Sequence, residues 1–295
     1  MLRIVLLGRT GNNMFQYALG RVLAKKHGVP LILDASWFNG NGWAEVSHFL
    51  NLPLQAQVIR RWSVGARTLL KITGKHYWEY RGVPILREST HDQSFNSNFL
   101  DAPDDCMLFG YFQTPLYFES IAAELRTELN ELFRGAFQIG FGHDTRSPVA
   151  RASWPQSLIH TLAEESSVAV HVRRGDYLHH LAFAVCDNSY YHHSMHEMRS
   201  RLPKARFFIF SDDPDWCRNE FRHADVVVVD SGVSAGNPLH DLHLMSLASH
   251  HIIANSSYSW WAAWLGDKPD QQVIMPDRWY AHGTKAPIEE KRWKK

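Results

Sequence analysis

The second half of the chain alternates between short apolar runs and longer segments with helical periodicity. Five apolar runs have the composition of buried strands: residues 168–172, 207–210, 226–229, 251–254 and 272–275. The four segments between them have helical patterns: residues 190–201, 215–222, 238–249 and 257–265. Strands that alternate strictly with helices are joined by crossover connections, which produce parallel sheets. The second half is therefore predicted to form a parallel α/β sheet.

The first half of the chain begins with the same alternation. A strand, a helix and a strand are predicted in turn at residues 2–7, about 13–27 and 31–34. Residues 40–110 give no assignable pattern. Glycine and proline gather among polar residues at 134–155, which is typical of a loop. Since 295 residues suffice for about two domains, we expect α/β domains at 1–150 and 151–295.

Charge, hydropathy and cysteine content argue against several classes of protein. Lysine and arginine number 31 against 30 acidic residues, so a nucleic-acid binder with a broad basic face is not expected. The apolar start at Met1 to Leu7 is too short for a signal-peptide core or a membrane span, and no later run reaches membrane length. Three cysteines without CxxC spacing suggest neither a disulfide framework nor a zinc ribbon. We expect a cytoplasmic protein, and peripheral association with the inner face of the membrane is left open.

The predicted strand at 168–172 is followed directly by two arginines and an acid. Parallel sheets bind ligands at the carboxyl ends of their strands, where Arg173 and Arg174 are predicted to lie. A guanidinium is a planar fork of donors that can engage two phosphate oxygens. Asp176 could orient an arginine or accept a proton. The alternative is that these charges form ordinary surface salt bridges.

A glycine-bearing turn follows the first predicted strand. Gly11 and Asn12 lie at its junction with the next helix, where backbone amides and the helix dipole can approach an anionic ligand. The spacing is not the G-x-G-x-x-G of dinucleotide-binding proteins. An ordinary glycine turn with an asparagine cap is the alternative.

Small hydroxyl residues follow the strand at 251–254. Ser256 and Ser257 stand at a predicted helix start, so they are candidates for binding a diphosphate or simply for capping the helix. Asp241 has two interpretations as well. Its carboxylate could accept the N1 and N2 donors of guanine, or it could be an exposed acid at a helix start. Trp260, Trp261 and Trp264 recur at helical spacing and are predicted to be core.

Acids also follow the strand at 207–210. Asp212 could accept ribose hydroxyls, or Asp212 and Asp213 together could hold a divalent metal. Asp213 followed by proline is typical of a helix start. Because two arginines can neutralise a diphosphate, no metal or other cofactor is expected. His192 and His196 lack a further ligand at metal spacing and are predicted to be solvated.

These motifs together resemble glycosyltransferase family 11, the α1,2-fucosyltransferases. His171-Val-Arg173-Arg174-Gly-Asp176 resembles the H-x-R-R-x-D motif of enzymes that use GDP-fucose. Asp241-x-x-x-Met-Ser, continuing to Asn255-Ser-x-Tyr-Ser-Trp-Trp-Ala-Ala-Trp, resembles the family's later motifs. Residues 11–18 resemble its opening G-N-Q-M-F-Q-Y-A, although Asn13 replaces the glutamine and Arg9-Thr10 replace the preceding Gly-Leu.

The resemblance implies a GT-B-like fold, in which two Rossmann-type domains face a cleft and the second holds GDP-fucose. The first domain would lie on the acceptor side. It also implies contacts for individual residues: His171 and Asp241 with guanosine, Arg173 with the β-phosphate, Ser256 and Ser257 with the diphosphate, and Asn12 with the donor from the opposite domain. Gly11, Arg174 and Asp212 complete the set predicted to bind the donor.

The implied reaction is inverting, metal-independent transfer of L-fucose from GDP-β-L-fucose to the 2-hydroxyl of a terminal galactose. Arg173 would stabilise the leaving phosphate. Asp176, His179, His180 and a donor phosphate oxygen compete for the proton of the acceptor. The acceptor would be a galactose-terminated oligosaccharide or glycolipid of a bacterial-type glycan pathway, and nucleic acid is not an expected partner. The alternatives are another linkage and a non-catalytic nucleotide-sugar-binding protein.

The aromatic residues at 95–99 and 111–118 have two interpretations. They could line an acceptor groove, since aromatic faces suit sugars, or they could be core, which is the commoner place for aromatic residues.

Overall fold

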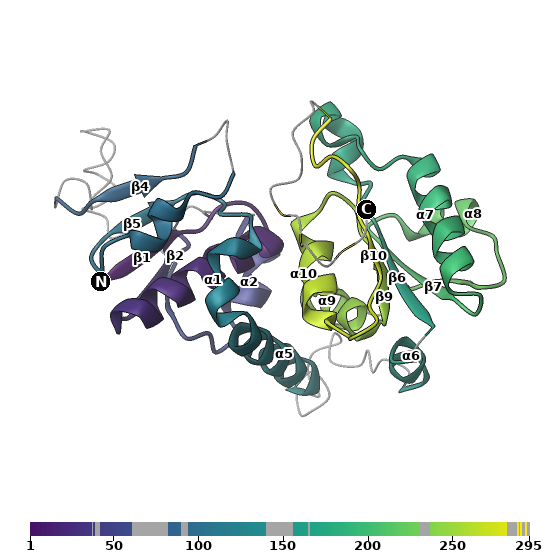
Figure 1. Cartoon of the computed structure of the whole chain (residues 1–295), viewed down its shortest axis with the longest axis horizontal. Coiled ribbons are helices and arrows are strands. Elements are labelled where there is room, and N and C mark those ends of the chain that lie inside the picture. The colour runs from purple at the N-terminus through teal and green to yellow at the C-terminus, as the bar shows by residue number, and fades with distance from the viewer. Residues whose placement is uncertain are drawn as a thin grey trace. The chain divides into compact units, whose positions relative to one another are not determined.

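The computed structural model of the protein divides into two compact units, Met1–Thr127 and Glu128–Lys295 (Figure 1). It describes residues 1–36, 38, 42–60, 82–89, 94–139, 156–164, 166–230, 237–281, 288, 290 and 293. The predicted domain boundary between residues 150 and 151 lies outside these ranges and stays a prediction. Helix α5 (Ala122–Ile139) crosses the division between the two units.

The first unit is built on a parallel sheet with the strand order β3-β2-β1-β5-β4. Its strands are β1 (Leu2–Val5), β2 (Leu31–Asp34), β3 (Gln57–Ile59), β4 (Ile85–Arg87) and β5 (Met107–Phe109). Its helices are α1 (Thr10–His27), α2 (Gly42–Leu50) and the 3-10 helices η1 (Ser97–Asp101), η2 (Pro115–Tyr117) and η3 (Glu119–Ile121). The segment 40–110, which gave no pattern, contributes three strands of only three residues each.

The second unit contains a second parallel sheet with the strand order β10-β9-β6-β7-β8. Its strands are β6 (Ser167–Val172), β7 (Arg206–Ser211), β8 (Val226–Val228), β9 (His250–Ile252) and β10 (Val273–Ile274). Its helices are α6 (Gln156–Leu162), η5 (Asp176–His179), η6 (Leu181–Phe183), α7 (Asn188–Arg201), α8 (Pro214–Glu220), α9 (Pro238–Leu247) and α10 (Ser257–Gly266). All nine segments predicted here are confirmed, with their ends within two residues.

Helices on both faces bury the second sheet. Figure 1 shows α9 and α10 on one face and α7 and α8 on the other. Every residue of β6 is buried, as expected for a central parallel strand covered on two sides. Trp260, Trp261 and Trp264 are at most 2% exposed, which confirms that the tryptophans of α10 are core.

In both sheets the strand order reverses beside the first strand of the unit, so that later strands are added on its other side. In the second unit, β7 and β8 extend the sheet on one side of β6, and the chain then returns to place β9 on the other side. In the first unit, β2 and β3 lie on one side of β1, while β5 and β4 lie on the other. Open parallel sheets bind ligands beyond the carboxyl ends of the strands at such a switch point. The strand order therefore points to the edges after β6 and β9 and after β1 and β5.

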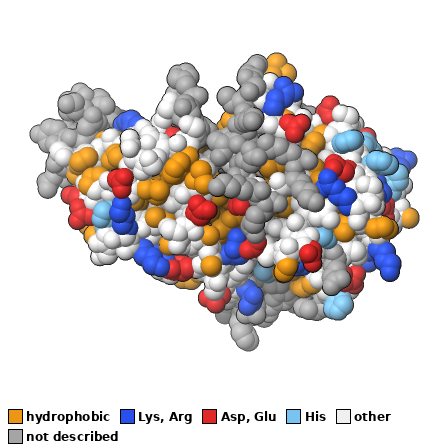
Figure 2. Space-filling view, in the orientation of Figure 1, with side chains coloured by type: hydrophobic (Ala, Val, Ile, Leu, Met, Phe, Trp, Pro, Cys, Tyr) orange, Lys and Arg blue, Asp and Glu red, His pale blue; other side chains and the backbone are white. Residues whose placement is uncertain are grey.

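Other features of the chain agree with its composition. Acidic and basic side chains are interspersed on the face shown in Figure 2. The three cysteines, Cys106, Cys186 and Cys217, are all free. Within the described ranges, no helix combines the length and the apolar character needed to cross a membrane.

Candidate functional site

Arg173 lies at the carboxyl edge of the second sheet, one residue beyond the buried strand β6. Its Nη2 is 2.6 Å from Oδ1 of Asp176, and its Nη1 is 2.9 Å from Oδ2 of Asp212. The side chain is only 20% exposed. The predicted salt bridges therefore exist, and they lie at the carboxyl edge of the sheet, where the Asp176 and Asp212 side chains are 35% and 25% exposed. Two carboxylates thus hold this guanidinium by both of its terminal nitrogens.

Arg174 is held by a second set of contacts. Its backbone N–H donates to Oδ1 of Asp212 at 2.9 Å, and its Nε lies 3.1 Å from Oδ2 of Asp213. The guanidinium carbon is 3.7 Å from the centroid of the Trp216 ring, which is cation–π geometry. Sequence reasoning missed Trp216. Its position three residues after Asp213, in the first turn of the predicted helix, is the signal that could have found it.

Asp213 also starts α8. Its Oδ1 accepts a hydrogen bond from the backbone N–H of Trp216 at 3.2 Å, and Pro214 occupies the first turn. The predicted helix start is confirmed. Asp212 and Asp213 thus pair with arginines, which is a different use from the metal ligation that the sequence left open. Across the described residues, no cluster of three or more histidine, cysteine or acidic side chains has a geometry suited to a metal. His192 and His196 are exposed, as predicted.

The loops after β6 and β9 are connected across the switch point. The hydroxyl of Tyr177 donates to the carbonyl oxygen of Asn255 at 3.1 Å. The Asn255 side chain is buried, and its Nδ2 donates to the carbonyl oxygens of Phe183 and Trp279 at 3.1 and 3.0 Å. Stacking of Tyr177 on Phe183, with ring centroids 5.0 Å apart, strengthens this connection. The two edges that flank the predicted ligand site are therefore fixed relative to each other.

Ser256 precedes the first turn of α10. It occupies the N-cap position, but its side chain makes no capping hydrogen bond. The backbone N–H of Trp260 donates to the Ser256 carbonyl oxygen at 3.0 Å and so begins the helix. Side-chain capping, the alternative function of this serine, is therefore wrong. Ser257 is half-buried beside it at the start of the helix.

His171 is a buried histidine at the end of β6. Burial, assisted by the positive charge of Arg173, lowers its pKa to about 3, so the ring is neutral near pH 7. Its Nδ1 is buried and has no hydrogen-bond partner among the described residues. The ring packs against Tyr258 of α10, with centroids 5.5 Å apart. A neutral ring with an unused nitrogen can make one hydrogen bond to an uncharged ligand group.

Asp241 lies in the first turn of α9. It is not exposed, because the side chain is half-buried and Oδ1 is fully buried with no hydrogen-bond partner in the described part of the chain. Burial raises its pKa to about 7. Burial raises the pKa of the neighbouring helix residue Tyr258, and the charges of Asp241 and Arg173 shift that pKa in opposite directions. An unpaired buried carboxylate oxygen is costly unless a ligand supplies a donor.

The first unit has a smaller site at its own switch point. Helix α1 begins at Thr10, so Gly11 and Asn12 lie in its first turn. The predicted start at about Asn13 is three residues late, and the asparagine cap is wrong because Arg9 is the N-cap residue. Asn12 accepts a hydrogen bond at Oδ1 from Nε2 of Gln113, which follows β5, at 2.5 Å. The edges after β1 and β5 therefore meet at Asn12.

Two buried amides that sequence reasoning missed support this junction. Asn13 Nδ2 donates to the Leu7 carbonyl oxygen at 2.9 Å, and Gln16 Nε2 donates to the Gly110 carbonyl oxygen at 2.8 Å. The two side chains also bond each other at 3.0 Å. Their three-residue spacing on a helix that follows a buried strand is the sequence signal for such a network.

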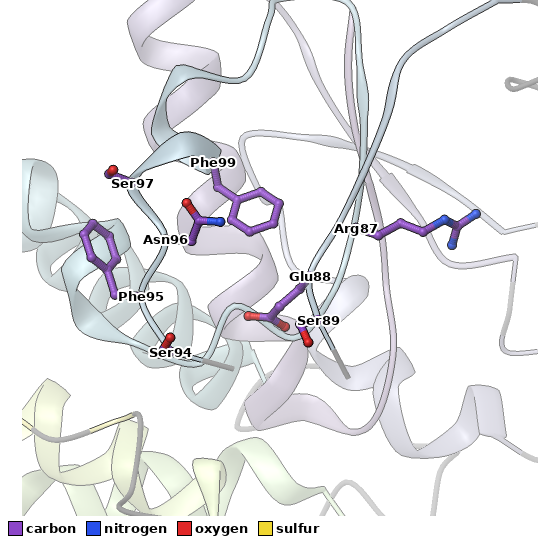
Figure 3. Close-up of a pocket in the computed structure, with 8 residues that line it drawn as sticks. All are labelled: Arg87, Glu88, Ser89, Ser94, Phe95, Asn96, Ser97 and Phe99. Atoms are coloured by element: carbon purple, nitrogen blue, oxygen red, sulfur yellow. The ribbon is translucent and has the colours of Figure 1, made fainter. Parts of the chain in front are cut away.

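A polar cavity of about 490 Å³ lies at the carboxyl end of β4 (Figure 3). It is lined by Arg87, Glu88, Ser89, Ser94, Phe95, Asn96, Ser97 and Phe99. In Figure 3 the Arg87 side chain extends away from the other labelled residues. The Glu88 carboxylate accepts the backbone N–H groups of Tyr111 and Phe112 at 2.6 and 3.0 Å, so one wall of the cavity is fixed.

The aromatic segments are mostly core. Phe99, Phe112, Tyr117 and Phe118 are buried, as the core interpretation predicts. Phe95 differs from them because it is 37% exposed at the polar cavity. Phe95 therefore offers an exposed aromatic face for the acceptor groove that the sequence proposed, and Tyr111 of the second segment is half-buried.

The layout of the chain is that of a known class of enzymes. Two Rossmann-type parallel sheets, the second with arginines at its switch point, are GT-B-like, a layout used by many glycosyltransferases. Residues 156–295 match the family model of glycosyl transferase family 11, and this part of the chain belongs to that family. The predictions of the α/β fold with two Rossmann-type units and of the family are confirmed.

Three relatives with named activities are similar to parts or all of the chain. An alpha-1,2-colitosyltransferase of Escherichia coli is 33% identical over 180 residues, which cover 58% of this chain and only 55% of that protein. The O-antigen biosynthesis glycosyltransferase WbnK of Escherichia coli is 27% identical over 98% of both chains. The galactoside 2-alpha-L-fucosyltransferase SEC1 of Bos taurus is 36% identical over 104 residues, 33% of this chain and 28% of that one. The chain is thus similar to glycosyltransferases, fucosyltransferases among them.

Two solved structures are weakly similar to the chain. Fucosyltransferase NodZ from Bradyrhizobium is 15% identical, with a TM-score of 0.39 over 89% of this chain and 91% of that one. POFUT1 in complex with GDP-fucose is 13% identical, with a TM-score of 0.42 over 93% and 97%. The layout described above follows from the strand orders alone.

Proposed function

We propose that the protein transfers L-fucose from GDP-β-L-fucose to the 2-hydroxyl of a terminal galactose, with inversion. The observation that carries the proposal is a pair of buried polar atoms without a partner among the described residues, Oδ1 of Asp241 and Nδ1 of His171, in the unit whose Arg173 and Arg174 are held by carboxylates after β6. Membership in family 11 and the alpha-1,2 relatives support it.

The second unit offers complementary groups for each part of GDP. The Asp241 carboxylate can accept both the N1 and N2 donors of guanine, a pair that adenine, cytosine and uracil lack. The neutral His171 ring supplies one more hydrogen bond to the nucleoside. Arg174, Ser256 and Ser257 are proposed to hold the diphosphate, and Gly11 and Asn12 of the first unit are proposed to reach the donor.

Arg173 is the group best suited to the chemical step. Negative charge grows on the β-phosphate as the bond to fucose breaks, and a preorganised cation stabilises this transition state more than the ground state. Asp176, which contacts Arg173 at 2.6 Å, stays the proposed catalytic acid–base residue, with a donor phosphate oxygen as its alternative. His180 is exposed, and the side chain of His179 lies outside the described residues.

The acceptor is proposed to bind the first unit at the cavity beside β4. A volume of about 490 Å³ is within the range of sugar-sized ligands. An exposed aromatic ring next to a carboxylate, an amide and hydroxyl groups is suited to a galactoside, since a sugar has apolar C–H faces and polar edges. The relative in O-antigen biosynthesis supports a polysaccharide acceptor. A cytoplasmic location, at the inner membrane face for a lipid-linked acceptor, belongs to this proposal.

A second donor sugar has a specific observation in its favour. The colitosyltransferase is 33% identical to this chain over the matched residues, so transfer of colitose is the alternative to transfer of fucose. A different linkage and non-catalytic binding of a nucleotide sugar remain the further alternatives.

The proposal is tested by incubating the purified protein with GDP-fucose or nucleotide-activated colitose and a panel of β-galactosides. Free GDP and the linkage of the product are followed, with and without EDTA. An α1,2-linked fucoside is expected with wild type, and Arg173→Ala should lower kcat by about 10²- to 10³-fold. Arg218→Ala, which removes an exposed arginine that pairs with Asp215, is the control and should retain activity. Binding of GDP-fucose without turnover on any acceptor would favour the non-catalytic alternative.

A further inference from the structure

We propose that Asp212 is a positioning residue that holds both arginines of the phosphate site, rather than a ligand of ribose or of a metal. This inference rests on the proposed function, because it assigns a role within the same donor site. It replaces the ribose contact expected from the sequence.

Strand pairing places Asp212 beside the arginines. Val172 of β6 is the register partner of Ser211 of β7, so Arg173 and Asp212 are the next residues of two adjacent strands. Both oxygens of the carboxylate are engaged there. Oδ1 accepts the backbone N–H of Arg174, and Oδ2 contacts Nη1 of Arg173, each at 2.9 Å. One acid therefore sets the backbone of one arginine and the side chain of the other.

Gly175 shows that the turn and the acid are fitted to each other. A Cβ atom added at Gly175 would lie 2.7 Å from Oδ2 of Asp212, which is closer than carbon and oxygen can approach. The carboxylate can therefore keep its contact with Arg173 only because residue 175 has no side chain. This close approach ties the geometry of the turn to the position of Asp212.

The consequence is an arginine that is ordered before any ligand arrives. Asp212 and Asp176 bind different terminal nitrogens of Arg173, so the guanidinium plane is fixed from two directions. A long side chain that is already ordered loses less conformational entropy when it binds a phosphate. Its Nε and the second hydrogens of both Nη atoms supply the donors that the two carboxylates do not use.

The negative charge of Asp212 and its proposed positioning of the arginines predict opposite effects on GDP binding when Asp212 is replaced. A carboxylate beside a phosphate site repels the ligand, so its removal should tighten GDP binding if only charge mattered. If Asp212 positions the arginines, its removal should weaken GDP binding and leave guanosine, which has no phosphate, unaffected. If Asp212 binds ribose, GDP and guanosine should weaken together.

The experiment measures GDP and guanosine binding to Asp212→Asn by titration calorimetry, with near-ultraviolet circular dichroism to confirm folding. We expect the Kd for GDP to rise about tenfold or more and the Kd for guanosine to change less than about twofold. Gly175→Ala should give the same pattern, because it displaces the carboxylate without changing any charge. Asp215→Asn is the charge-matched control. Its side chain is 90% exposed in the same region, and it should alter neither affinity.

Three results would overturn the inference. Tighter GDP binding by Asp212→Asn would show that charge dominates, and an equal loss of GDP and guanosine affinity would assign Asp212 to ribose. Unchanged GDP affinity in both Asp212→Asn and Gly175→Ala would show that the arginines need no such support. Failure of the wild-type protein to bind GDP would instead contradict the proposed function itself, so the two failures are distinguishable.

Discussion

Asp241 combines a buried oxygen that has no hydrogen-bond partner among the described residues with a pKa raised to about 7, so ligand binding and stability should both depend on pH through this one group. Burial favours its protonated form, whereas guanine donors require the carboxylate. Ligand binding must therefore supply the hydrogen bonds that compensate for ionisation. His171 does not titrate in the same range because its pKa is lowered to about 3.

We expect the GDP affinity of the wild-type protein to rise with pH up to about 7, by about tenfold per pH unit below that value if only the carboxylate binds. Asp241→Asn should lack this part of the pH dependence. Calorimetry of both proteins across the range measures it, and the ionisation of GDP itself cancels in the comparison. Parallel pH profiles for the two proteins would contradict the assigned contact.

The same pKa shift predicts the sign of a stability effect. The folded-state pKa lies above the ordinary value of 3.8, so the stabilisation by protonated Asp241 is complete below pH 3.8 and is lost as pH rises through about 7. The free energy of unfolding of Asp241→Asn, measured relative to that of the wild type, should therefore increase by about 1–2 kcal/mol from about pH 5.5 to pH 8. Urea unfolding at the two pH values measures this gain. A relative stability of Asp241→Asn that is higher at pH 5.5 than at pH 8 would contradict the predicted sign.

Substitution of Phe95 should distinguish acceptor binding from donor binding, because its ring lies at the proposed acceptor cavity. Phe95→Ala should raise the KM for the galactoside by about tenfold through loss of ring contact, and leave the Kd for GDP unchanged. Val227→Ala, an equally exposed apolar residue at 37% but on β8, is the matched control. Equal effects of the two substitutions on KM would remove the reason to place the acceptor at this cavity.

At the scale of elements, the junction of β1 and α1 depends on one glycine. Gly8 has a φ of +73°, and a Cβ there would lie 2.0 Å from Nδ2 of Asn12. Gly8→Ala should reduce the free energy of unfolding by about 1–3 kcal/mol and also displace Asn12, which lowers turnover.

Gly28→Ala is the matched control for Gly8→Ala. Gly28 ends α1 with a φ of +64°, but a Cβ atom there meets no described residue within 4 Å. We expect it to cost about 1 kcal/mol of stability and to leave turnover unchanged. Chemical denaturation and steady-state rates compare the two variants. Loss of turnover in Gly28→Ala would show that activity follows stability alone.

The strands of the second unit could be predicted because each overlaps a run of four or five mostly apolar residues that alternates with helical patterns, although β8, β9 and β10 themselves have only two or three residues. The run that ends at Val172 is buried throughout, and Pro214 and Pro238 mark helix starts in both sequence and structure. Strands β3, β4 and β5 are equally short, and they lie in the segment 40–110, where no regular alternation of apolar runs and helical patterns marks them. The early start of α1 was missed because its cap, Arg9, makes no side-chain capping bond.

The candidate site was predictable in its residue types but not in its pairings. The motifs named Arg173, Arg174 and Asp212 separately. Only the parallel register of β6 and β7, which depends on contacts between distant segments, shows that Asp212 bonds both arginines. Likewise, periodicity gave no indication that the Asp241 oxygen is buried, because that depends on how α9 packs.

At the scale of the whole molecule, the two units are proposed to have separate ligands, and hydrogen exchange can test this division of roles. GDP should slow amide exchange at residues 171–177, 238–242 and 254–258 of the second unit, where the switch point gathers the donor groups. These segments lie at strand and helix ends, which open more readily than the buried strands. A β-galactoside should instead protect residues 94–99 of the first unit.

Hydrogen exchange with GDP and with the galactoside added separately can show which unit binds the donor and which binds the acceptor. GDP alone is also expected to protect the first turn of α1 at residues 10–13, because Asn12 is proposed to contact the donor. Arg173→Ala should weaken protection by GDP at every one of these segments and leave protection by the galactoside at 94–99 intact. Protection of 94–99 by GDP alone would place the donor at the cavity beside β4 and reverse the roles of the two units.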